Sequence, residues 1–304
     1  MTKTVAVTGG TGFIGKYIIQ NLLSHGFVVR ALTRRQQQTT TENLTWVQGS
    51  LEDPRSLDNL VQGADYVVHC AGQVRGSSEK TFVDCNVSGS LRLMQAAQQS
   101  GSCQRFLFMS SLAAREPELS WYAKSKYIAE QQLASLACDI TLGIFRPTAV
   151  YGPGDKELKP IFNWLLRGVL PRLGSLDTEL TFIHASDLAE AISQWLLAER
   201  PPTQPCELCD GMDGGYSWQR LQAIGSAVRK GPVRLVGVSL SLLKVMADVS
   251  IGWNRLIKKE PMLTHSKIRE LTHPDWSASN QVLSDATNWV PTISVERALR
   301  EGLF

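Results

Sequence analysis

The chain has 304 residues, of which 43% are hydrophobic and 19% charged, enough for one large globular unit or two interleaved lobes. Its formal net charge of +3 is too small to predict binding to nucleic acid or to an anionic membrane. No run of 18 apolar residues predicts a membrane span and no export signal is visible, so we expect a cytoplasmic protein with reduced cysteines.

The pattern of the first 32 residues predicts a βαβ unit. Residues 4–8 alternate β-branched and small side chains and end in glycines, which predicts a buried strand. The apolar spacing over 16–24 predicts a helix, and residues 27–32 predict a second strand. Two parallel strands joined by a helix should cross over with right-handed connectivity.

Glycines at 9, 10, 12 and 15 occupy the turn between the first strand and the helix. They match the G-x-G-x-x-G pattern, in which missing side chains let the backbone approach a pyrophosphate and let the helix pack closely on its strand. The helix N-terminus adds free N–H groups and a favourable dipole. The turn therefore predicts a dinucleotide site that uses Gly9, Thr11, Gly12, Phe13, Ile14 and Gly15.

The end of the second strand bears on which nicotinamide cofactor binds. An acid at this place hydrogen-bonds the ribose 2′-hydroxyl of NAD, whereas an arginine pairs with the 2′-phosphate of NADP. Arg34 and Arg35 stand here, and no acid does. The sequence thus favours NADP(H) over NAD(H).

The alternation of strands and helices continues to about residue 150. Short apolar strands are expected over 65–69, 105–109 and 140–145, with a helix over 87–99. We therefore predict an α/β fold, a doubly wound parallel sheet of the Rossmann kind with a smaller, interleaved C-terminal lobe. Residues 1–150 would bind the dinucleotide, with 182–212 returning to that domain, and residues 151–181 and 213–304 would bind substrate.

Two later segments have ordinary structural interpretations. Residues 233–257 are largely apolar and predict a strand and a helix that pack in the core. Two less favoured interpretations are that they line a substrate pocket or contact a membrane surface. Cys206 and Cys209 form a CxxC, but a zinc ribbon needs a second pair. A buried strand that carries two thiols is the simpler interpretation, and we expect no metal.

Tyr122 and Lys126 are four residues apart in a segment rich in helix formers, so both should lie on one helical face. A phenol is a poor proton donor and acceptor at neutral pH, and a neighbouring ammonium lowers its pKa toward the working range. Ser110 and Ser111 directly follow a predicted strand, at the sheet edge where open α/β sheets bind ligands. A serine there can orient a substrate oxygen, although a turn cap is the alternative.

With these motifs in place, the chain resembles the extended short-chain dehydrogenases/reductases of the NAD(P)-dependent epimerase/dehydratase type. The likeness covers most of the chain. It rests on residues 8–15, 69–72, 86–89, 110–111, Tyr122 with Lys126, 146–153, 182–184 and Asp187.

The resemblance implies a role for each matching residue. Tyr122 would be the general acid/base, Lys126 would hold the nicotinamide ribose and tune Tyr122, and Ser111 would orient the substrate oxygen. Asn86 would support the site, while His184 and Asp187 have less certain roles. Contacts with the cofactor would come from Ala71, Gly72, Ser110, Pro147, Thr148 and Val150. The resemblance also suggests a homodimer through helices near Lys126.

Departures from the family pattern narrow the reaction. Ser111 is followed by Leu112-Ala113 instead of the Asp-Glu pair of sugar-nucleotide dehydratases. Ala149 and Leu180-Thr181 replace an asparagine and an arginine found in many sugar-nucleotide epimerases, so a diphosphate would miss two partners. The hydroxysteroid dehydrogenase and dihydroflavonol reductase-like branch is closer, and residues 261–264 and 288–291 fit it.

The leading hypothesis is an NADP(H)-dependent oxidoreductase that interconverts a secondary alcohol and a ketone or aldehyde on a small, mostly apolar molecule. One alternative is a sugar-nucleotide epimerase with tightly bound NAD. The other is a catalytically silent NAD(P)-binding scaffold or sensor, against which the Ser111, Tyr122 and Lys126 trio argues.

Overall fold

The computed structural model describes residues 2–37, 41–256 and 264–304, with the backbone alone over 251–256. Part of the expected loop at 36–42 and most of the 261–264 motif lie outside these ranges.

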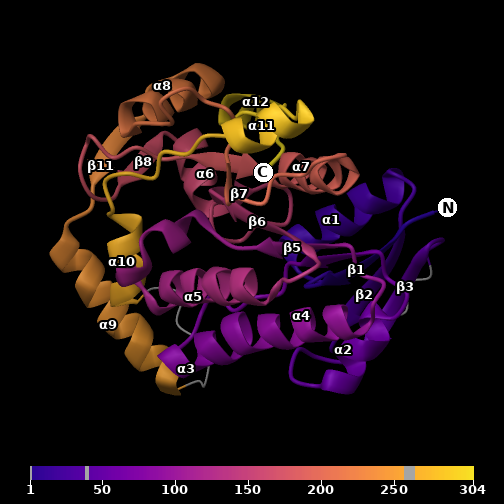
Figure 1. The fold of residues 1–304 in the computed structure, drawn as a ribbon. Helices are drawn as coiled ribbons and strands as arrows, with labels where there is room; N and C mark the ends of the chain where they lie inside the picture. Colours follow the sequence, from indigo (N-terminus) through magenta and orange to yellow (C-terminus); the bar gives the residue numbers. More distant parts are fainter. Residues whose placement is uncertain (1, 38–40, 257–263) are drawn as a thin grey trace.

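A seven-stranded parallel sheet forms the centre of the molecule, in the order β10-β6-β5-β4-β1-β2-β3 (Figure 1). The chain reverses its direction of progress across the sheet between β1 and β4, the kind of place where open α/β sheets bind ligands. The predicted doubly wound fold is therefore confirmed. The strands are β1 (Thr4–Thr8), β2 (Val28–Thr33), β3 (Leu44–Gln48), β4 (Tyr66–His69), β5 (Arg105–Met109), β6 (Thr141–Pro147) and β10 (Cys206–Leu208).

Helices cover both faces of the sheet (Figure 1). α1 (Phe13–Ser24) and α7 (Ala185–Leu197) pack together on one face, where Trp195 is fully buried. The other face carries α2 (Pro54–Val61), α4 (Gly89–Gln99) and α5 (Trp121–Leu136), which form a second core with the sheet. Between β4 and α4 the chain forms α3 (Glu79–Phe82) and a π-helical segment, η1 (Val83–Ser88).

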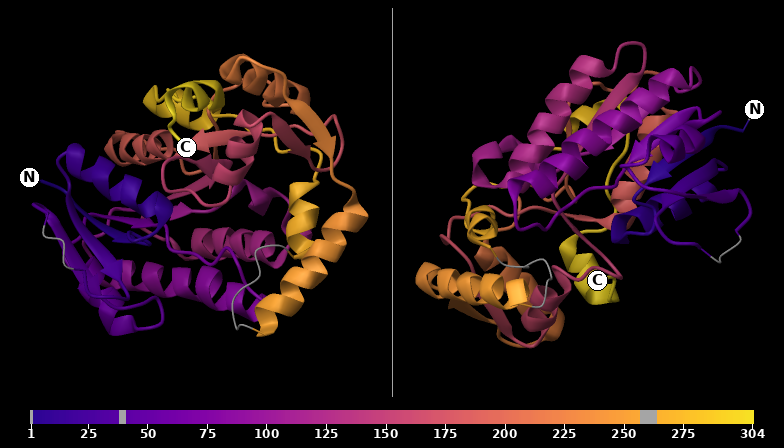
Figure 2. Two further views of the ribbon diagram at one scale, coloured as in Figure 1. Left: turned by 180° about the vertical axis from the view of Figure 1, so that it is seen from behind. Right: turned by 90° about the horizontal axis from the view of Figure 1, so that it is seen from below.

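The C-terminal part builds a third core from two small sheets and short helices (Figure 2). β7 (Ala149–Tyr151) pairs with β9 (Phe182–His184), and β8 (Val169–Arg172) pairs with β11 (Arg234–Gly237), all in parallel. Because β10 joins β6, the chain returns to the large sheet after β9 and α7. The remaining helices are α6 (Lys159–Leu166), α8 (Trp218–Arg229), α9 (Leu240–Leu256), α10 (His265–Leu271), α11 (Gln281–Thr287) and α12 (Val295–Glu301).

α9 packs less completely than its apolar sequence predicts. Leu243 and Ala247 are buried against α10, as expected for a core helix. A second apolar row on the same helix is exposed: Leu242, Val245, Met246 and Val249. The expected strand and helix are thus present, but half of the apolar surface faces outward. None of the helices in the described ranges is long and apolar enough to cross a membrane.

Candidate active site

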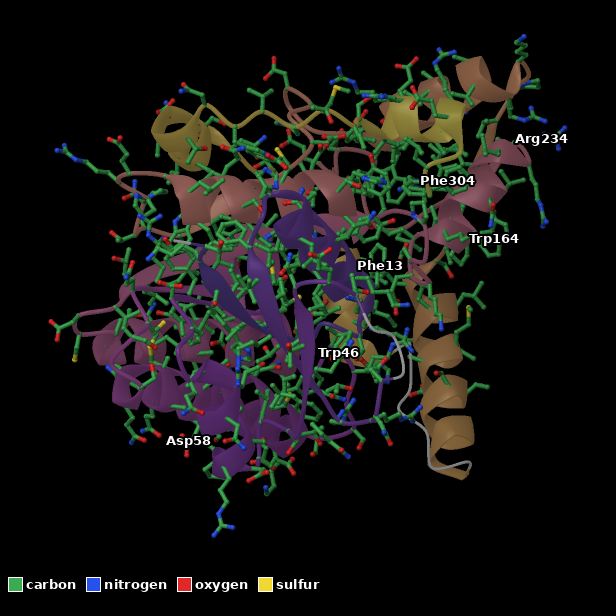
Figure 3. The ribbon with its side chains drawn as sticks, turned by 90° about the vertical axis from the view of Figure 1, so that its right-hand side faces the viewer. Phe13, Trp46, Asp58, Trp164, Arg234 and Phe304 are labelled. Atoms are coloured by element: carbon green, nitrogen blue, oxygen red, sulfur yellow. The ribbon has the colours of Figure 1, made fainter. Side chains whose placement is uncertain are left out.

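The glycine turn after β1 has the shape that a pyrophosphate requires. Gly9 adopts φ +77°, and a β-carbon there would lie 2.7 Å from the backbone nitrogen of Ala71, while one on Gly15 would overlap the carbonyl oxygen of Gly9. Gly12 caps α1 without a side chain, so it adds no competing oxygen to the first N–H groups of the helix. Phe13, the first residue of α1, is seen between Trp46 of β3 and Trp164 of α6 in Figure 3. The glycines therefore let the turn pack tightly against the loop after β4, and the first N–H groups of α1 have no side-chain cap, as at helix N-termini that bind anions.

A buried chain of hydrogen bonds joins this turn to the next strand. Thr8 Oγ1 accepts the N–H of Ala71 at 3.2 Å and lies 2.6 Å from Nδ1 of His69. On the other side of the ring, Nε2 lies 2.8 Å from Oγ of Ser90, which donates to the carbonyl of Asn86. Because the hydroxyl of Ser90 donates its proton to Asn86, its Oγ can only accept from the ring, so Nε2 of His69 is the protonated nitrogen. Burial lowers the pKa of His69 to about 3, so the ring stays neutral.

Asn86 holds the loop after β4 against α5. Its side-chain oxygen accepts the N–H of Gln73 at 2.7 Å, and its amide nitrogen donates to the carbonyl of Gln73 and to Oγ of Ser125. Ser125 lies on α5 and donates to the carbonyl of Tyr122 at 2.8 Å. The buttressing role implied for Asn86 thus has a physical route, from the Ala71-Gly72 strip to α5.

Ser111 and Tyr122 face each other across the turn between β5 and α5. The hydroxyl of Ser111 acts on the phenol and lowers its pKa, and Oγ of Ser111 accepts the N–H of Ala113 at 3.2 Å. Ser111 therefore caps the 3-10 turn η2 (Leu112–Arg115), the alternative role considered for it. Its role in orienting a substrate oxygen stays a prediction.

The pKa of Tyr122 shifts in the direction opposite to the one predicted. Burial raises it to about 12, the Ser111 hydrogen bond lowers it, and the charges of Glu270 and Cys70 raise it further. The tyrosine–lysine spacing predicts a neighbouring ammonium but says nothing of burial. In this structure the amine is bound elsewhere, and desolvation of the phenolate is the largest effect.

Lys126 lies one turn after Tyr122 on α5 and is 4% exposed. Its Nζ donates to the carbonyl of Met109 at 2.8 Å and stands 4.8 Å from the centre of the Phe108 ring. Burial lowers its pKa to about 8. A β-carbon on Gly72 would lie 3.1 Å from this amine, so the strip expected to touch the cofactor directly adjoins Lys126.

Ser110 faces away from Ser111 into a buried ion pair. Its hydroxyl donates to Glu130 of α5, and Arg146 of β6 donates to the same carboxylate through Nε at 2.9 Å. Glu130 is 1% exposed. The structure therefore gives Ser110 a clear role in joining β5 to α5, beside the cofactor contact that the family resemblance implies.

The segment that leaves β6 carries an unused polar atom. Thr148 is buried, and within the described chain its hydroxyl has no hydrogen-bond partner. Its backbone N–H donates to the carbonyl of Leu208, whereas the next residues, Ala149 and Val150, pair with β9. Such an orphan hydroxyl fits a ligand that completes its hydrogen bonding. Together with the uncapped N-terminus of α1 after the glycine turn, it fits a nicotinamide dinucleotide.

Arg34 and Arg35 follow the last residue of β2 and are exposed. Oγ1 of Thr33 accepts the N–H of Arg35 at 3.2 Å, which sets the turn. Neither guanidinium forms an ion pair with a carboxylate in the ranges that the structure covers. Both are therefore free to meet a phosphate beside the glycine turn.

His184 and Asp187 have structural roles. His184 caps α7 through the N–H of Ser186, and its other ring nitrogen lies 3.1 Å from the carbonyl of Leu303. Asp187 accepts the N–H groups of Thr292 and Ile293 and the hydroxyl of Thr292. These contacts join the C-terminal segment to α7.

Two residues of the site were missed in the sequence. Glu270 of α10 accepts the hydroxyl of Ser120, the residue that caps α5, and its charge acts on Tyr122. Because 150 residues separate the two partners, no spacing rule brings them together.

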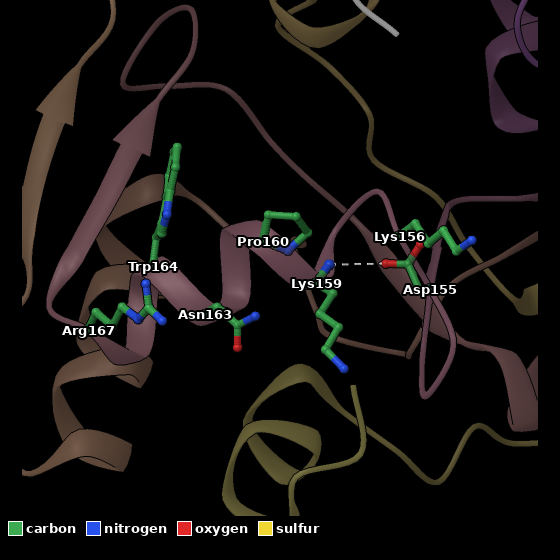
Figure 4. A pocket seen from close by; sticks show the side chains of 7 residues that line it. All are labelled: Asp155, Lys156, Lys159, Pro160, Asn163, Trp164 and Arg167. Atoms are coloured by element: carbon green, nitrogen blue, oxygen red, sulfur yellow. Dashed lines mark hydrogen bonds between the residues drawn. The ribbon is translucent and has the colours of Figure 1, made fainter.

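The remaining groups give no second site. Cys206 and Cys209 are buried on and after β10, and the described residues contain no cluster of three metal-ligating side chains. An open groove of about 380 Å³ lies on α6 and contains no candidate residue (Figure 4). In it Asp155 accepts the backbone N–H of Lys159, so its carboxylate serves to start α6.

Comparisons with known proteins show which proteins the chain is similar to. Residues 5–205 match the model of the NAD dependent epimerase/dehydratase family. The chain is 33% identical to a ceramide reductase of Caulobacter vibrioides over 288 residues, covering 92% of this chain and 88% of that protein. It is 29% identical to a decarboxylating sterol-4-alpha-carboxylate 3-dehydrogenase of Dictyostelium discoideum, over 86% and 88% of the two chains. The UDP-glucose 4-epimerase of Thermotoga maritima has the same fold, with a TM-score of 0.72, 20% identity and coverage of 98% and 96%.

Proposed function

The chain belongs to the NAD dependent epimerase/dehydratase family and is an oxidoreductase of that family, and we propose that it is an NADP(H)-dependent one acting on a ketone or secondary alcohol. The observation that carries this proposal is the placement of Tyr122 and the buried Lys126 one turn apart on α5, with the hydroxyl of Ser111 acting on the phenol. The substrate would be a small, mostly apolar molecule.

The proton chemistry follows from the states of these groups. With its pKa raised to about 12, Tyr122 is protonated at neutral pH and is ready to donate a proton to a carbonyl oxygen. Ser111 would orient that oxygen through its hydroxyl. A bound reduced nicotinamide would supply the hydride to the carbonyl carbon. In the reverse direction the phenolate oxygen of Tyr122 would accept the proton of the alcohol.

Lys126 would support both ligand and phenol. Its pKa of about 8 leaves the amine mostly charged at pH 7, and its position beside Gly72 is where a nicotinamide ribose would lie. A charged amine placed there favours the phenolate that forms when Tyr122 gives up its proton. Asn86 and Ser125 would keep α5 and the Gly72 strip in register during this step.

The preference for NADP(H) is supported by Arg34 and Arg35, two unpaired guanidinium groups after β2 in the described chain. A guanidinium matches the 2′-phosphate in charge and geometry. Hydrogen-bonding donors for the pyrophosphate would come from the start of α1, and Thr148 would offer its hydroxyl to the nicotinamide end.

An apolar substrate is supported by the relatives named for ceramide and sterol substrates. The two positions where many sugar-nucleotide epimerases carry polar partners for the diphosphate also support it. At one of them the hydroxyl of Thr181 already donates to the carbonyl of Trp276, and at the other Ala149 has no polar side-chain atom. These positions would therefore not bind a sugar diphosphate.

The deciding experiment is a titration of NADPH and NADH against the purified protein, followed by a screen of ketones and alcohols of increasing chain length. Hydride transfer is followed through the nicotinamide absorbance. We expect tighter binding of NADPH and turnover of long-chain ketones. Stoichiometric NAD that survives dialysis would favour an epimerase, and NADPH binding without turnover across the screen would favour a silent subunit.

A further inference from the structure

α10 comes from the C-terminal part of the chain and lies against the start of α5. Glu270 is 7% exposed and accepts the hydroxyl of Ser120. Ser120 caps α5 by accepting the N–H of Ala123 at 3.0 Å. One residue earlier, Nε of Arg269 donates to the carbonyl of Leu119 at 2.9 Å. α10 is therefore attached to the two residues that lead into the catalytic helix.

The charged groups around this contact are few. Nζ of Lys267 lies 2.9 Å from the second oxygen of Glu270, but this lysine is about half exposed and its charge is screened by solvent. The Phe82 ring packs edge-on against Tyr122, and Lys126 follows on the same helix. The groups whose charge or hydroxyl acts on the phenol are Glu270, Cys70 and Ser111. Among these groups Glu270 is the carboxylate, and Ser120 links it to the start of α5.

We propose that Glu270 is a positioning residue for proton transfer at Tyr122: through Ser120 it fixes the first turn of α5 and so the place of the phenol beside Ser111. The inference rests on the proposed catalytic role of Tyr122. Tyr122 is two residues from the cap, so its backbone moves with the cap. A hydroxyl bound to a carboxylate is held more firmly than one bound to a neutral oxygen. A negative charge near a helix N-terminus is also favourable.

The proposal predicts different kinetic results for three variants. Glu270→Gln keeps an oxygen for Ser120 and removes the charge, Glu270→Ala removes both, and Ser120→Ala breaks the link from the other side. We expect Glu270→Ala and Ser120→Ala to lower kcat about tenfold and to leave the KM for NADPH within about twofold. Glu270→Gln should keep kcat within about threefold and should move the Tyr122-dependent limb of the pH profile to lower pH, because it removes a negative charge that raises the tyrosine pKa. The control is Glu296→Gln, an exposed glutamate of α12.

A measurement without substrate keeps this inference separate from the proposed function. The chain is labelled with ¹³C at the tyrosine Cζ, and the Tyr122 signal is assigned by its loss in Tyr122→Phe. Its titration should begin at lower pH in Glu270→Gln than in the parent or in Glu296→Gln, and melting curves confirm that each variant is folded. That result supports the link even if Tyr122→Phe proves active. Parental kcat in both Glu270→Ala and Ser120→Ala, while Tyr122→Phe is inactive, would overturn it.

Discussion

The amine of Lys126 lies where only a glycine at position 72 leaves it room. A β-carbon on Gly72 would stand 3.1 Å from Nζ of Lys126 and 3.2 Å from Oδ1 of Asn86. Neither neighbour is loose, because the carbonyl of Met109 holds the amine and the backbone of Gln73 holds the amide. The loop after β4 and the catalytic helix therefore pack as one unit, and a change in either should reach the chemistry.

Gly72→Ala tests this packing. The added methyl should displace Lys126 or Asn86 by a few tenths of an ångström and lower kcat by about tenfold or more, since small misplacements of reacting groups are costly. Gly63→Ala is the matched control, because its β-carbon meets nothing within 4 Å although its φ is +69°. The control should lower the melting temperature slightly and leave kcat unchanged. Equal kcat in the two variants would show that the site tolerates the methyl.

Tyr122→Phe removes the proposed proton donor and keeps the ring. We expect kcat to fall by about a hundredfold or more, within the range of general acid–base catalysis, while the affinity for NADPH stays the same. Tyr127→Phe is the control, since Tyr127 lies on the same helix and is 39% exposed. Steady-state kinetics and nucleotide binding measured by fluorescence give the two readouts. Near-normal turnover in Tyr122→Phe would remove the tyrosine from the mechanism.

Arg34→Ala should weaken the discrimination between the two nucleotides. The loss of one charged hydrogen bond to a 2′-phosphate is worth about 1.5–3 kcal/mol, so we expect the KM for NADPH to rise about tenfold or more. The KM for NADH should hardly change, because NADH has no such phosphate. Arg55→Ala, which removes an exposed arginine from α2, is the control. A parallel rise for both nucleotides would assign Arg34 to general binding.

Local patterns were enough to predict β1, β2, β4, β5 and β6 of the large sheet. They placed the first helix three residues late, because Gly12 caps α1 without a side chain and the usual cap signal is missing. β3 was missed because it is an edge strand without a clean alternation of buried and exposed residues. α2 was also missed, although Asp53 caps it through the N–H of Arg55.

Residue spacing in the sequence predicted only part of the candidate site, because it carries no information on burial or on contacts between residues far apart in the chain. Four residues between Tyr122 and Lys126 predict a shared helical face, and the structure places both on α5. Spacing cannot reveal that burial raises the tyrosine pKa or that the amine first binds Met109. The contact from Glu270 to Ser120 depends on how α10 packs, and no local pattern contains it. The π-helical turn that carries Asn86 likewise departs from the helical period on which the prediction relied.

His69 should make the stability of the fold depend on pH. Its folded-state pKa of about 3 lies below the ordinary value of 6.5, so between these limits the unfolded chain binds a proton that the folded chain excludes. Its contribution is therefore complete above pH 6.5 and is lost as the pH falls toward 3. At about 1.4 kcal/mol per pKa unit, roughly 3 kcal/mol should disappear between pH 6.5 and pH 4.

Urea denaturation at pH 7, 5.5 and 4 measures this loss, and a His69→Gln variant isolates it. The variant will be less stable at pH 7, because Thr8 and Ser90 lose a ring nitrogen placed between them. Its free energy of unfolding should nevertheless fall less steeply with acid than that of the parent, since glutamine binds no proton in either state. Parallel slopes in His69→Gln and the parent would mean that water or a carboxylate reaches the ring and lets it charge inside the folded protein.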